Sequence, residues 1–199
     1  MRGFVVVAAE IIVVLALLTS CAGSKAAGPY ASQDAARRDT SAAEALNREA
    51  AAKLESDPKA AEALLREALA RDLFFGPAHN NLGVLHLGRG EFYEAANEFE
   101  WARKLLPGNA DPRINLAITL ERAGRTSDAL AEYKGALEVQ PGSVVAMQGA
   151  AVLAVRSGKD EPQLAAWLKE IAMSGESEAW RAWARSARSF HSSVNSTSQ

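Results

Sequence analysis

The sequence has few of the residues on which metal sites and catalytic centres usually depend. Its 199 residues include one cysteine and three histidines, so no intrachain disulfide can form and the paired thiols of zinc sites are absent. The sequence also has no glycine-rich phosphate loop and no HExxH motif. We therefore expect a protein that is not an enzyme and that holds no cofactor or metal.

Charge and composition also narrow the kind of partner. The 24 acidic residues nearly balance the 22 basic residues, giving a formal net charge of −2, so there is no reason to expect a nucleic-acid partner. Aromatic residues make up only 7% of the chain, whereas alanine is frequent. Abundant alanine favours helices, and its small side chain suits helices that pack closely together.

The first 21 residues have the features of a secretion signal that ends in the single cysteine. Arg2 precedes an apolar run over residues 4–18, which Glu10 interrupts. At about 15 residues the run is short for a helix that crosses ~30 Å of hydrocarbon, as is usual for a signal peptide. It ends in Leu18-Thr19-Ser20-Cys21, which resembles the lipobox of bacterial lipoproteins.

The lipobox resemblance implies an address in the bacterial cell envelope. It implies that residues 1–20 are a signal peptide and that Cys21 is acylated and holds the protein at a membrane through lipid. An uncleaved anchor, or an ordinary signal with an accidental cysteine, are the alternatives. Ala22 stands where aspartate would favour the inner membrane, so the periplasmic face of the outer membrane is expected. Residues 21–40 are small and polar and are predicted to be a flexible tether.

The most regular part of the sequence is residues 76–109, whose pattern recurs in residues 110–143. Small residues allow two helices to approach closely, glycine fits a tight turn and proline ends a helix. Each 34-residue segment is therefore predicted to form two antiparallel helices. The matched positions are Leu82 and Leu116, Gly83 and Ala117, Gly90 and Gly124, Ala95 and Ala129, Phe99 and Tyr133, Ala102 and Ala136, and Pro107 and Pro141.

This pattern resembles the tetratricopeptide repeat family. The units of that family have small residues at the eighth, twentieth and twenty-seventh places and a proline near the thirty-second, which correspond here to Gly83, Ala95, Ala102 and Pro107 and to Ala117, Ala129, Ala136 and Pro141. Large aromatic residues that the family often has are replaced by His79 and His86 in the first of these repeats. The resemblance implies an all-α solenoid of stacked helical hairpins, with about three to four repeats.

Weaker copies flank the two regular repeats. The predicted array covers residues 41–175, with repeats at about 42–75, 76–109, 110–143 and 144–177. In the first copy we expect Ser41 to cap the first helix and Asp57-Pro58 to begin the second, while Glu49 occupies the small-residue place. Residues 176–189 are predicted to form a capping helix and residues 190–199 a disordered tail.

Two pairs of side chains each have two interpretations. His79 and His86 share a helix face and could bind metal, but they stand at packing places of the repeat, which favours histidines in the core or at its boundary. Trp180 and Trp183 lie on the apolar face of the capping helix. Packing of the cap is favoured for them over an aromatic patch that binds a partner.

In this family the first helix of each hairpin lines a concave groove, and the resemblance assigns its second, fifth, ninth and twelfth residues to that groove. The positions are Pro77, Asn80, Val84 and Leu87, then Asp111, Ile114, Ile118 and Glu121, then Val145, Gln148, Val152 and Val155. The ninth places, Val84, Ile118 and Val152, predict an apolar track for a helix or an extended peptide. The basic residues with which some members clamp a peptide carboxylate are absent. Alternatively, the C-terminal helix or the N-terminal segment fills the groove.

Fold and address together predict a membrane-anchored scaffold that binds a protein or peptide partner in the envelope. Pilus or secretin assembly is the leading setting, because small lipoproteins of this build serve there. An adaptor for peptidoglycan-remodelling enzymes is the first alternative. A metal-binding protein or enzyme that uses His79 and His86 is the second.

Overall fold

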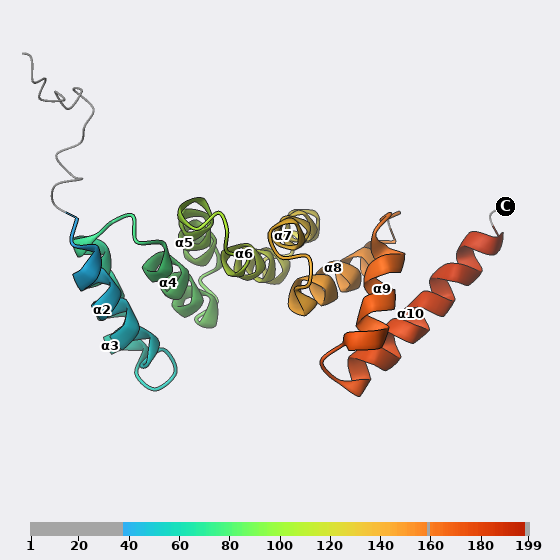
Figure 1. Cartoon of the computed structure of the whole chain (residues 1–199), viewed down its shortest axis with the longest axis horizontal. Helices are drawn as coiled ribbons and strands as arrows, with labels where there is room; N and C mark the ends of the chain where they lie inside the picture. Colours follow the sequence, from blue (N-terminus) through green and yellow to red (C-terminus); the bar gives the residue numbers. More distant parts are fainter. Residues whose placement is uncertain (1–37, 159, 198–199) are drawn as a thin grey trace, which may run out of the picture. The chain divides into compact units, whose positions relative to one another are not determined.

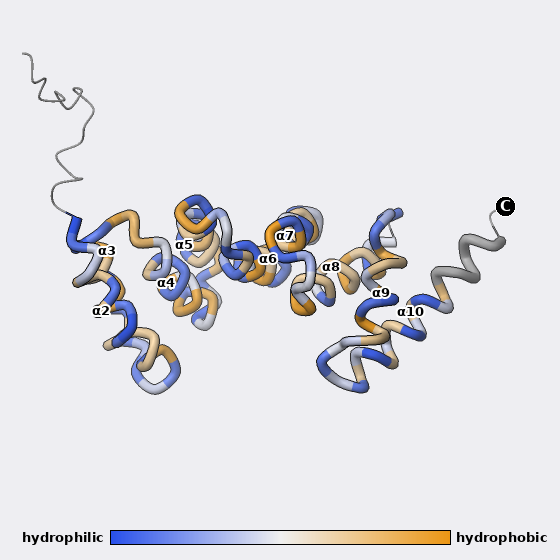
Figure 2. Tube along the Cα trace, viewed as in Figure 1, coloured by the Kyte–Doolittle hydropathy of each residue, from blue (hydrophilic) through white to orange (hydrophobic). Residues whose placement is uncertain are grey.

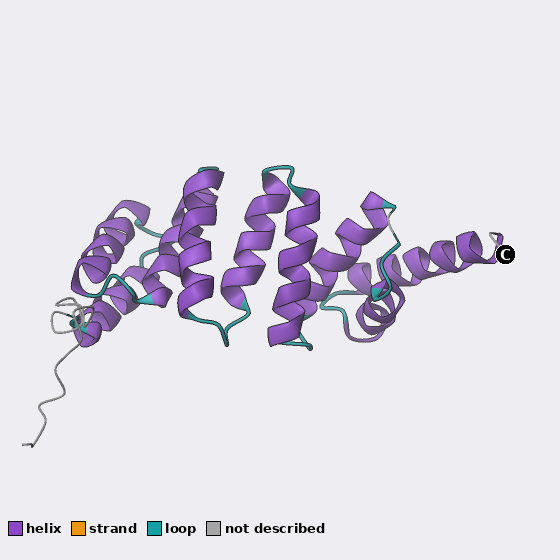
Figure 3. Cartoon of the chain, turned by 90° about the horizontal axis from the view of Figure 1, so that it is seen from above, coloured by secondary structure: helices purple, strands orange, loops and turns teal. Residues whose placement is uncertain are grey.

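The structure is a computed structural model that describes residues 38–158 and 160–197, and all regular secondary structure in those residues is helical (Figure 1, Figure 3). The helices are α2 Thr40–Ala51, α3 Pro58–Arg71, α4 Gly76–Gly88, α5 Phe92–Leu105, α6 Asp111–Arg122, α7 Thr126–Val139, α8 Val144–Ser157, α9 Leu164–Ser174 and α10 Glu178–Thr197. The all-α prediction is confirmed.

The helices from α2 to α9 pair as four hairpins that stack in chain order (Figure 1). The second, third and fourth hairpins lie within the segments 76–109, 110–143 and 144–177 that the repeat pattern defined. The first helices of successive hairpins also touch, α2 with α4, α4 with α6 and α6 with α8. Contacts mainly between neighbours are the geometry of a helical solenoid.

The ends of the helices follow the local sequence, with one wrong assignment. Asp57 caps α3 as predicted, because its carboxylate accepts the Ala60 amide at 3.1 Å and Pro58 begins the helix. At α2 the cap is Asp39, which accepts the Ala42 amide at 3.0 Å, and the predicted cap Ser41 lies inside the helix. An aspartate placed just before the first helical residue accepts from the exposed amides of the first turn.

Residues 38–40 belong to the folded unit, so the predicted tether at 21–40 extends too far. The Arg38 guanidinium donates to the Asp72 carboxylate at 2.8 Å, and the Thr40 hydroxyl donates to it at 2.7 Å. Burial raises the pKa of Asp72, but the hydrogen bonds from Arg38, Thr40 and the Phe74 amide outweigh it, and the pKa lies below its usual value. A buried carboxylate needs such partners, and the start of the chain's folded part supplies them.

The last helix is longer than predicted. α10 continues to Thr197, whereas a helix ending at residue 189 and a disordered tail over 190–199 were expected. No glycine or proline follows Gly175 to end the helix, and the Ser189 hydroxyl donates to the Arg185 carbonyl within it at 3.1 Å. No helix in the described ranges is long and apolar enough to cross a membrane.

Close approach of helices depends on small residues. Ala95, Ala102, Ala129 and Ala136 are completely buried, as the repeat pattern predicted. In the first repeat the buried small residues of α2 are Ala43 and Ala50, and Ala50 is next to Glu49, which occupies the small-residue place of the pattern. The turns within the two regular hairpins use Gly90 and Gly124 at φ of 75° and 78°, a conformation that favours glycine.

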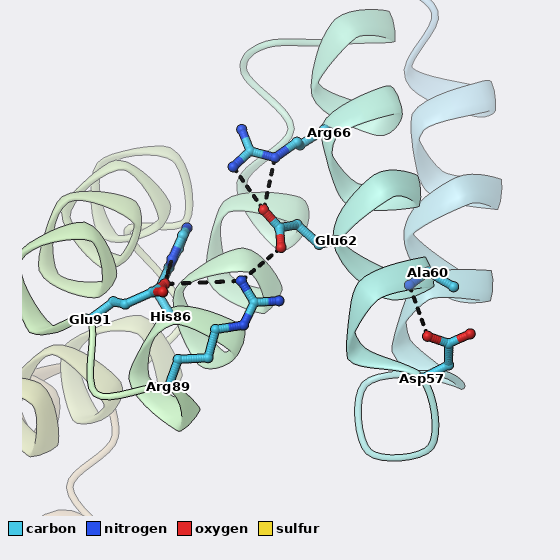
Figure 4. A network of polar contacts seen from close by, with 7 residues as sticks. All are labelled: Asp57, Ala60, Glu62, Arg66, His86, Arg89 and Glu91. Carbon is cyan, nitrogen blue, oxygen red and sulfur yellow. Dashed lines mark hydrogen bonds and ion pairs between the residues drawn. The ribbon is translucent and has the colours of Figure 1, made fainter.

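Ion pairs reinforce the joints between hairpins. Glu62 on α3 accepts from Arg66 on its own helix and from Arg89, which follows α4, at 2.8 and 2.7 Å (Figure 4). Further along, Glu132 on α7 accepts from Arg103 of α5 and from Arg113 of α6, at 2.7 and 3.1 Å. Each of these carboxylates therefore joins two successive repeats.

Candidate partner-binding face

Polar contacts join the first helices of successive hairpins along one face. The Asn115 amide on α6 donates to Asn80 on α4 at 3.0 Å, and Arg156 on α8 pairs with Glu121 on α6 at 3.2 Å. The predicted groove positions Asn80 and Glu121 therefore lie on neighbouring helices of the same side. We call this side the A-helix face; its predicted members are Asn80, Val84, Leu87, Ile114, Ile118, Glu121, Gln148, Val152 and Val155.

Most of these members are available at the surface. Val84 and Val155 are exposed, as is Val145 at the start of α8. The half-buried members are Asn80, Leu87, Ile118, Glu121 and Val152. Of the other predicted groove positions, Pro77 is half-buried and Asp111 is exposed. The apolar ninth places thus show part of their surface on α4, α6 and α8.

Two predicted groove residues are buried and cannot serve as open contact surface. Ile114 and Gln148, both at the fifth place of their repeat, are 8% and 6% exposed. Ile114 joins the main core cluster. The first helices touch one another, so the fifth places of α6 and α8 are covered by neighbouring side chains. The family position alone did not indicate this.

The buried side chain of Gln148 has an unsatisfied hydrogen-bond donor. Its Nε2 has no hydrogen-bond partner among the described residues. A buried donor without an acceptor costs free energy.

A row of asparagines crosses the A-helix face and was not predicted as a row. Asn47, Asn81 and Asn115 follow one another at 34-residue intervals on α2, α4 and α6. Asn81 donates to Asn47 at 2.9 Å, as Asn115 does to Asn80. A carboxamide has two donor hydrogens and two acceptor lone pairs, so these contacts leave capacity for a polypeptide backbone. The spacing was visible in the sequence and could have identified the row.

Glu121 has a mainly structural position on this face. Besides its pair with Arg156, it accepts a hydrogen bond from Tyr133 on α7. Burial, together with the charge and the hydrogen bond of Glu121, raises the pKa of Tyr133 to about 12. The carboxylate therefore joins α6, α7 and α8.

The two histidines of α4 are buried within their hairpin, which confirms the interpretation as core or boundary residues. Nδ1 of His79 lies 2.6 Å from Oε2 of Glu98, and Nδ1 of His86 lies 2.6 Å from Oε2 of Glu91. No group of three or more potential metal ligands occurs in the described part of the chain.

Both ring nitrogens of His79 face acceptors. Nε2 lies 2.9 Å from the Leu73 carbonyl, and the ring stacks on Trp101. Burial lowers the pKa of His79, but the hydrogen bonds with Glu98 and Leu73 and the charge of Glu98 outweigh it and raise the pKa above its usual value. The two acceptors therefore favour the protonated form of the ring.

The C-terminal helix does not fill the A-helix face. α10 packs on α9, Ala184 is completely buried there, and Trp180 and Trp183 pack against the main core cluster. The two tryptophan rings meet edge to face at 5.5 Å. Cap packing is confirmed, and filling of the groove by the C-terminal helix is wrong. The N-terminal segment and Cys21 lie outside the described residues.

Comparison with known proteins agrees with this geometry. The sequence pattern of the tetratricopeptide repeat family matches residues 86–152. Residues 86–152 therefore carry the tetratricopeptide repeat pattern, and the described helices have the all-α solenoid fold of such repeats. A search of curated proteins finds no match.

Solved tetratricopeptide repeat structures share the fold. A mutant of the O-GlcNAc transferase from Thermobaculum terrenum is 27% identical with a TM-score of 0.58; the match covers 70% of this chain but only 27% of that one. A tetratricopeptide repeat protein from Parabacteroides merdae is 20% identical with a TM-score of 0.61, covering 74% of this chain and 59% of that one. The first such domain of Spaghetti (RPAP3), bound to the HSP90 peptide SRMEEVD, is 13% identical with a TM-score of 0.58, covering 62% and 98%.

Proposed function

We propose that this protein is a lipid-anchored scaffold of the bacterial envelope that holds a segment of a partner protein on its A-helix face. The observation that carries the proposal is the combination on that face of the asparagine row with the exposed apolar side chains Val84 and Val155. Amides bind a polypeptide backbone without regard to its sequence. The exposed apolar side chains on the face would select apolar side chains in the bound segment.

The two halves of the face suit different parts of a partner. The asparagines of this face lie on α2, α4 and α6, beside the apolar Val84, Leu87 and Ile118, whereas α8 presents Val145, Val152 and Val155. An extended segment with apolar side chains along its length, whose backbone meets the asparagines at one end, fits this arrangement. The similar domain of Spaghetti (RPAP3) holds a peptide, which supports a peptide as ligand here.

The proposed cellular role follows from the location that a lipid anchor at Cys21 would give the protein. Acylation at Cys21 would hold the scaffold at the periplasmic face of the outer membrane, where pilus and secretin subunits are assembled. Assembly of such a subunit is the role we propose. An adaptor for peptidoglycan-remodelling enzymes would use the same face and differs only in the partner.

Site-specific photo-cross-linking in cells tests the scaffold. A photoreactive amino acid at Val84 or Val155 should cross-link to one and the same partner, which mass spectrometry then identifies. Tyr93 on α5 is 77% exposed and lies on a second helix, so the same probe there is the matched control. Equal cross-linking from Tyr93, or none from either valine, would refute binding on the A-helix face.

The lipid anchor has its own test. Intact-mass analysis of the membrane-extracted protein should show a mature chain that begins at Cys21 and carries acyl groups. Cys21→Ala should abolish the mass increase. An unmodified Cys21 in the mature protein would exclude the anchor but leave the scaffold untouched.

A further inference from the structure

Three of the large apolar side chains that the array leaves exposed lie around His79 and the loop between α3 and α4. Leu73 and Phe74 lie on the loop between α3 and α4, and Trp101 lies near the end of α5. Their exposed fractions are 59%, 42% and 46%. His79 connects them, because it contacts the Leu73 carbonyl and its ring stacks on Trp101 with 5.8 Å between centroids.

Each aromatic ring of this group carries a cation. The Arg38 guanidinium lies 5.0 Å from the centre of the Phe74 ring, and Nζ of Lys104 lies 5.7 Å from that of Trp101. The surface is therefore apolar in the middle and has two basic side chains at its margin, of which Arg38 is also paired with the Asp72 carboxylate. We call it the Phe74 patch, with the members Arg38, Leu73, Phe74, Trp101 and Lys104. Figure 2 shows the apolar loop between α3 and α4.

The patch is held in a fixed shape. The Phe74 amide donates to the Asp72 carboxylate at 3.0 Å, and the Phe75 amide donates to the Asp72 carbonyl at 3.1 Å. Asp72 is itself buried and paired with Arg38. Leu73 and Phe74 thus expose much of their side chains on a hydrogen-bonded loop, and we take a group of exposed apolar side chains of this kind as a candidate surface for another phase or molecule.

The size of the patch indicates what covers it. A stable protein interface uses about 20–30 residues on each side, whereas this patch has three apolar side chains. A lipid bilayer needs no matching surface, because apolar side chains enter the acyl boundary, tryptophan favours the interface and basic side chains reach the headgroups. Such contacts are weak alone and become effective when a tether raises the local concentration.

The Phe74 patch lies at the start of the described chain, at the end of the predicted tether. Arg38, the first described residue, lies on the Phe74 ring. From Cys21 to Arg38 the chain has about 17 residues and reaches at most about 60 Å when extended. An acyl group at Cys21 would therefore keep the Phe74 patch within about 60 Å of the bilayer. This step rests on the lipid anchor of the proposed function.

We propose that the Phe74 patch docks on the membrane surface, with Leu73 and Phe74 inserted at the acyl boundary and Arg38 and Lys104 at the lipid phosphates. Docking fixes the orientation of the array on its tether. The A-helix face then points in a set direction relative to the membrane from which a partner segment emerges.

The test uses the acylated full chain in vesicles of phosphatidylethanolamine with phosphatidylglycerol as the minor component. Leu73→Cys introduces one thiol, which is labelled with an environment-sensitive dye. Met173→Cys is the matched control, because Met173 is apolar, 68% exposed and on the distant helix α9. The dye at position 73 should shift its emission to shorter wavelength and be quenched by brominated lipids, and adding Phe74→Ser should reduce both effects. The dye at position 173 should keep its aqueous spectrum.

Two results would overturn docking. An aqueous spectrum at position 73 means that the patch stays in water. A shifted spectrum without quenching by brominated lipids means that a second copy of the chain covers the patch. Acylation is measured on the same sample by intact mass, so a missing lipid refutes the anchor independently of what the dye reports.

Discussion

Phe99 on α5 lies directly on Gly83 of α4. A Cβ atom at Gly83 would be 2.7 Å from Cε1 of Phe99, closer than two carbons can approach without movement. Tyr133, the equivalent ring of the next hairpin, lies instead against Gly149 of α8, in the hairpin that follows its own. Because these two positions have no side chain, one aromatic ring fills a contact within a hairpin and the other fills a contact between hairpins.

Gly83→Leu is therefore expected to destabilise the array by about 1–3 kcal/mol, because the added atoms overpack a filled core. Urea unfolding followed by circular dichroism measures the change. Gly88→Ala is the control on the same helix, since a Cβ there would meet nothing within 4 Å. It should be neutral or stabilise the helix by about 0.5–1 kcal/mol. Equal losses for both variants would show that the Phe99 contact does not matter.

The helices of the array could be predicted because their signals are local. Small residues at a 34-residue period, Asp57-Pro58 and the two turn glycines each act on the nearest few residues of backbone. Asp39 was missed as a cap because Ser41, a weaker candidate two residues later, also fitted the pattern. The end of α10 was missed because a polar sequence without glycine or proline gives no signal that ends a helix.

The candidate face was predicted less well, because exposure depends on neighbouring helices. The ninth places of the repeats are at the surface, but Ile114 and Gln148 are buried where first helices meet. The contacts of Arg38 with Asp72 and of His79 with Leu73 join segments whose sequences carry no pairing signal. Such contacts become visible only after the helices are stacked.

Glu132 should contribute to the coupling of repeats. Its carboxylate accepts from both Arg103 and Arg113 and is largely buried. A hydrogen bond to a charged group contributes about 1.5–3 kcal/mol to the free energy of unfolding. We expect Glu132→Ala to cost about 1–3 kcal/mol in urea unfolding. Glu49→Ala removes the exposed pair between Glu49 on α2 and Lys53, which follows that helix, and should cost less than about 0.5 kcal/mol. A Glu132 variant as stable as the Glu49 variant would contradict the role of the joint.

His79 should make stability depend on pH. Its pKa is raised in the folded protein, so the folded state binds the proton more tightly than the unfolded chain. The resulting stability is fully present below the unfolded value of about 6.5 and is lost as the pH rises through the folded pKa. Unfolding free energies measured across that interval should decline for the natural protein.

Glu98→Gln is the matched variant for this dependence. It keeps the shape of the side chain but removes the negative charge that favours the imidazolium, so the decline with pH should become shallower. Nuclear magnetic resonance titration of the His79 ring gives the pKa directly. A pKa below about 6.5 in the natural protein would refute the stabilisation of the protonated His79 ring by Glu98 and the Leu73 carbonyl.

The capping role of α10 leads to a prediction with a closely matched control. Ala184 is completely buried against the preceding helix, whereas Ala182, two residues earlier on α10, is exposed. Ala184→Arg forces a charge into the joint and should cost about 3 kcal/mol, while Ala182→Arg should be nearly neutral. Contacts in the array join mainly neighbours, so hydrogen exchange should accelerate in α9 and α10 and remain slow in α4 and α6. Equal behaviour of the two variants would mean that α10 does not pack on α9 in solution, and acceleration throughout would mean that the array unfolds as one cooperative unit.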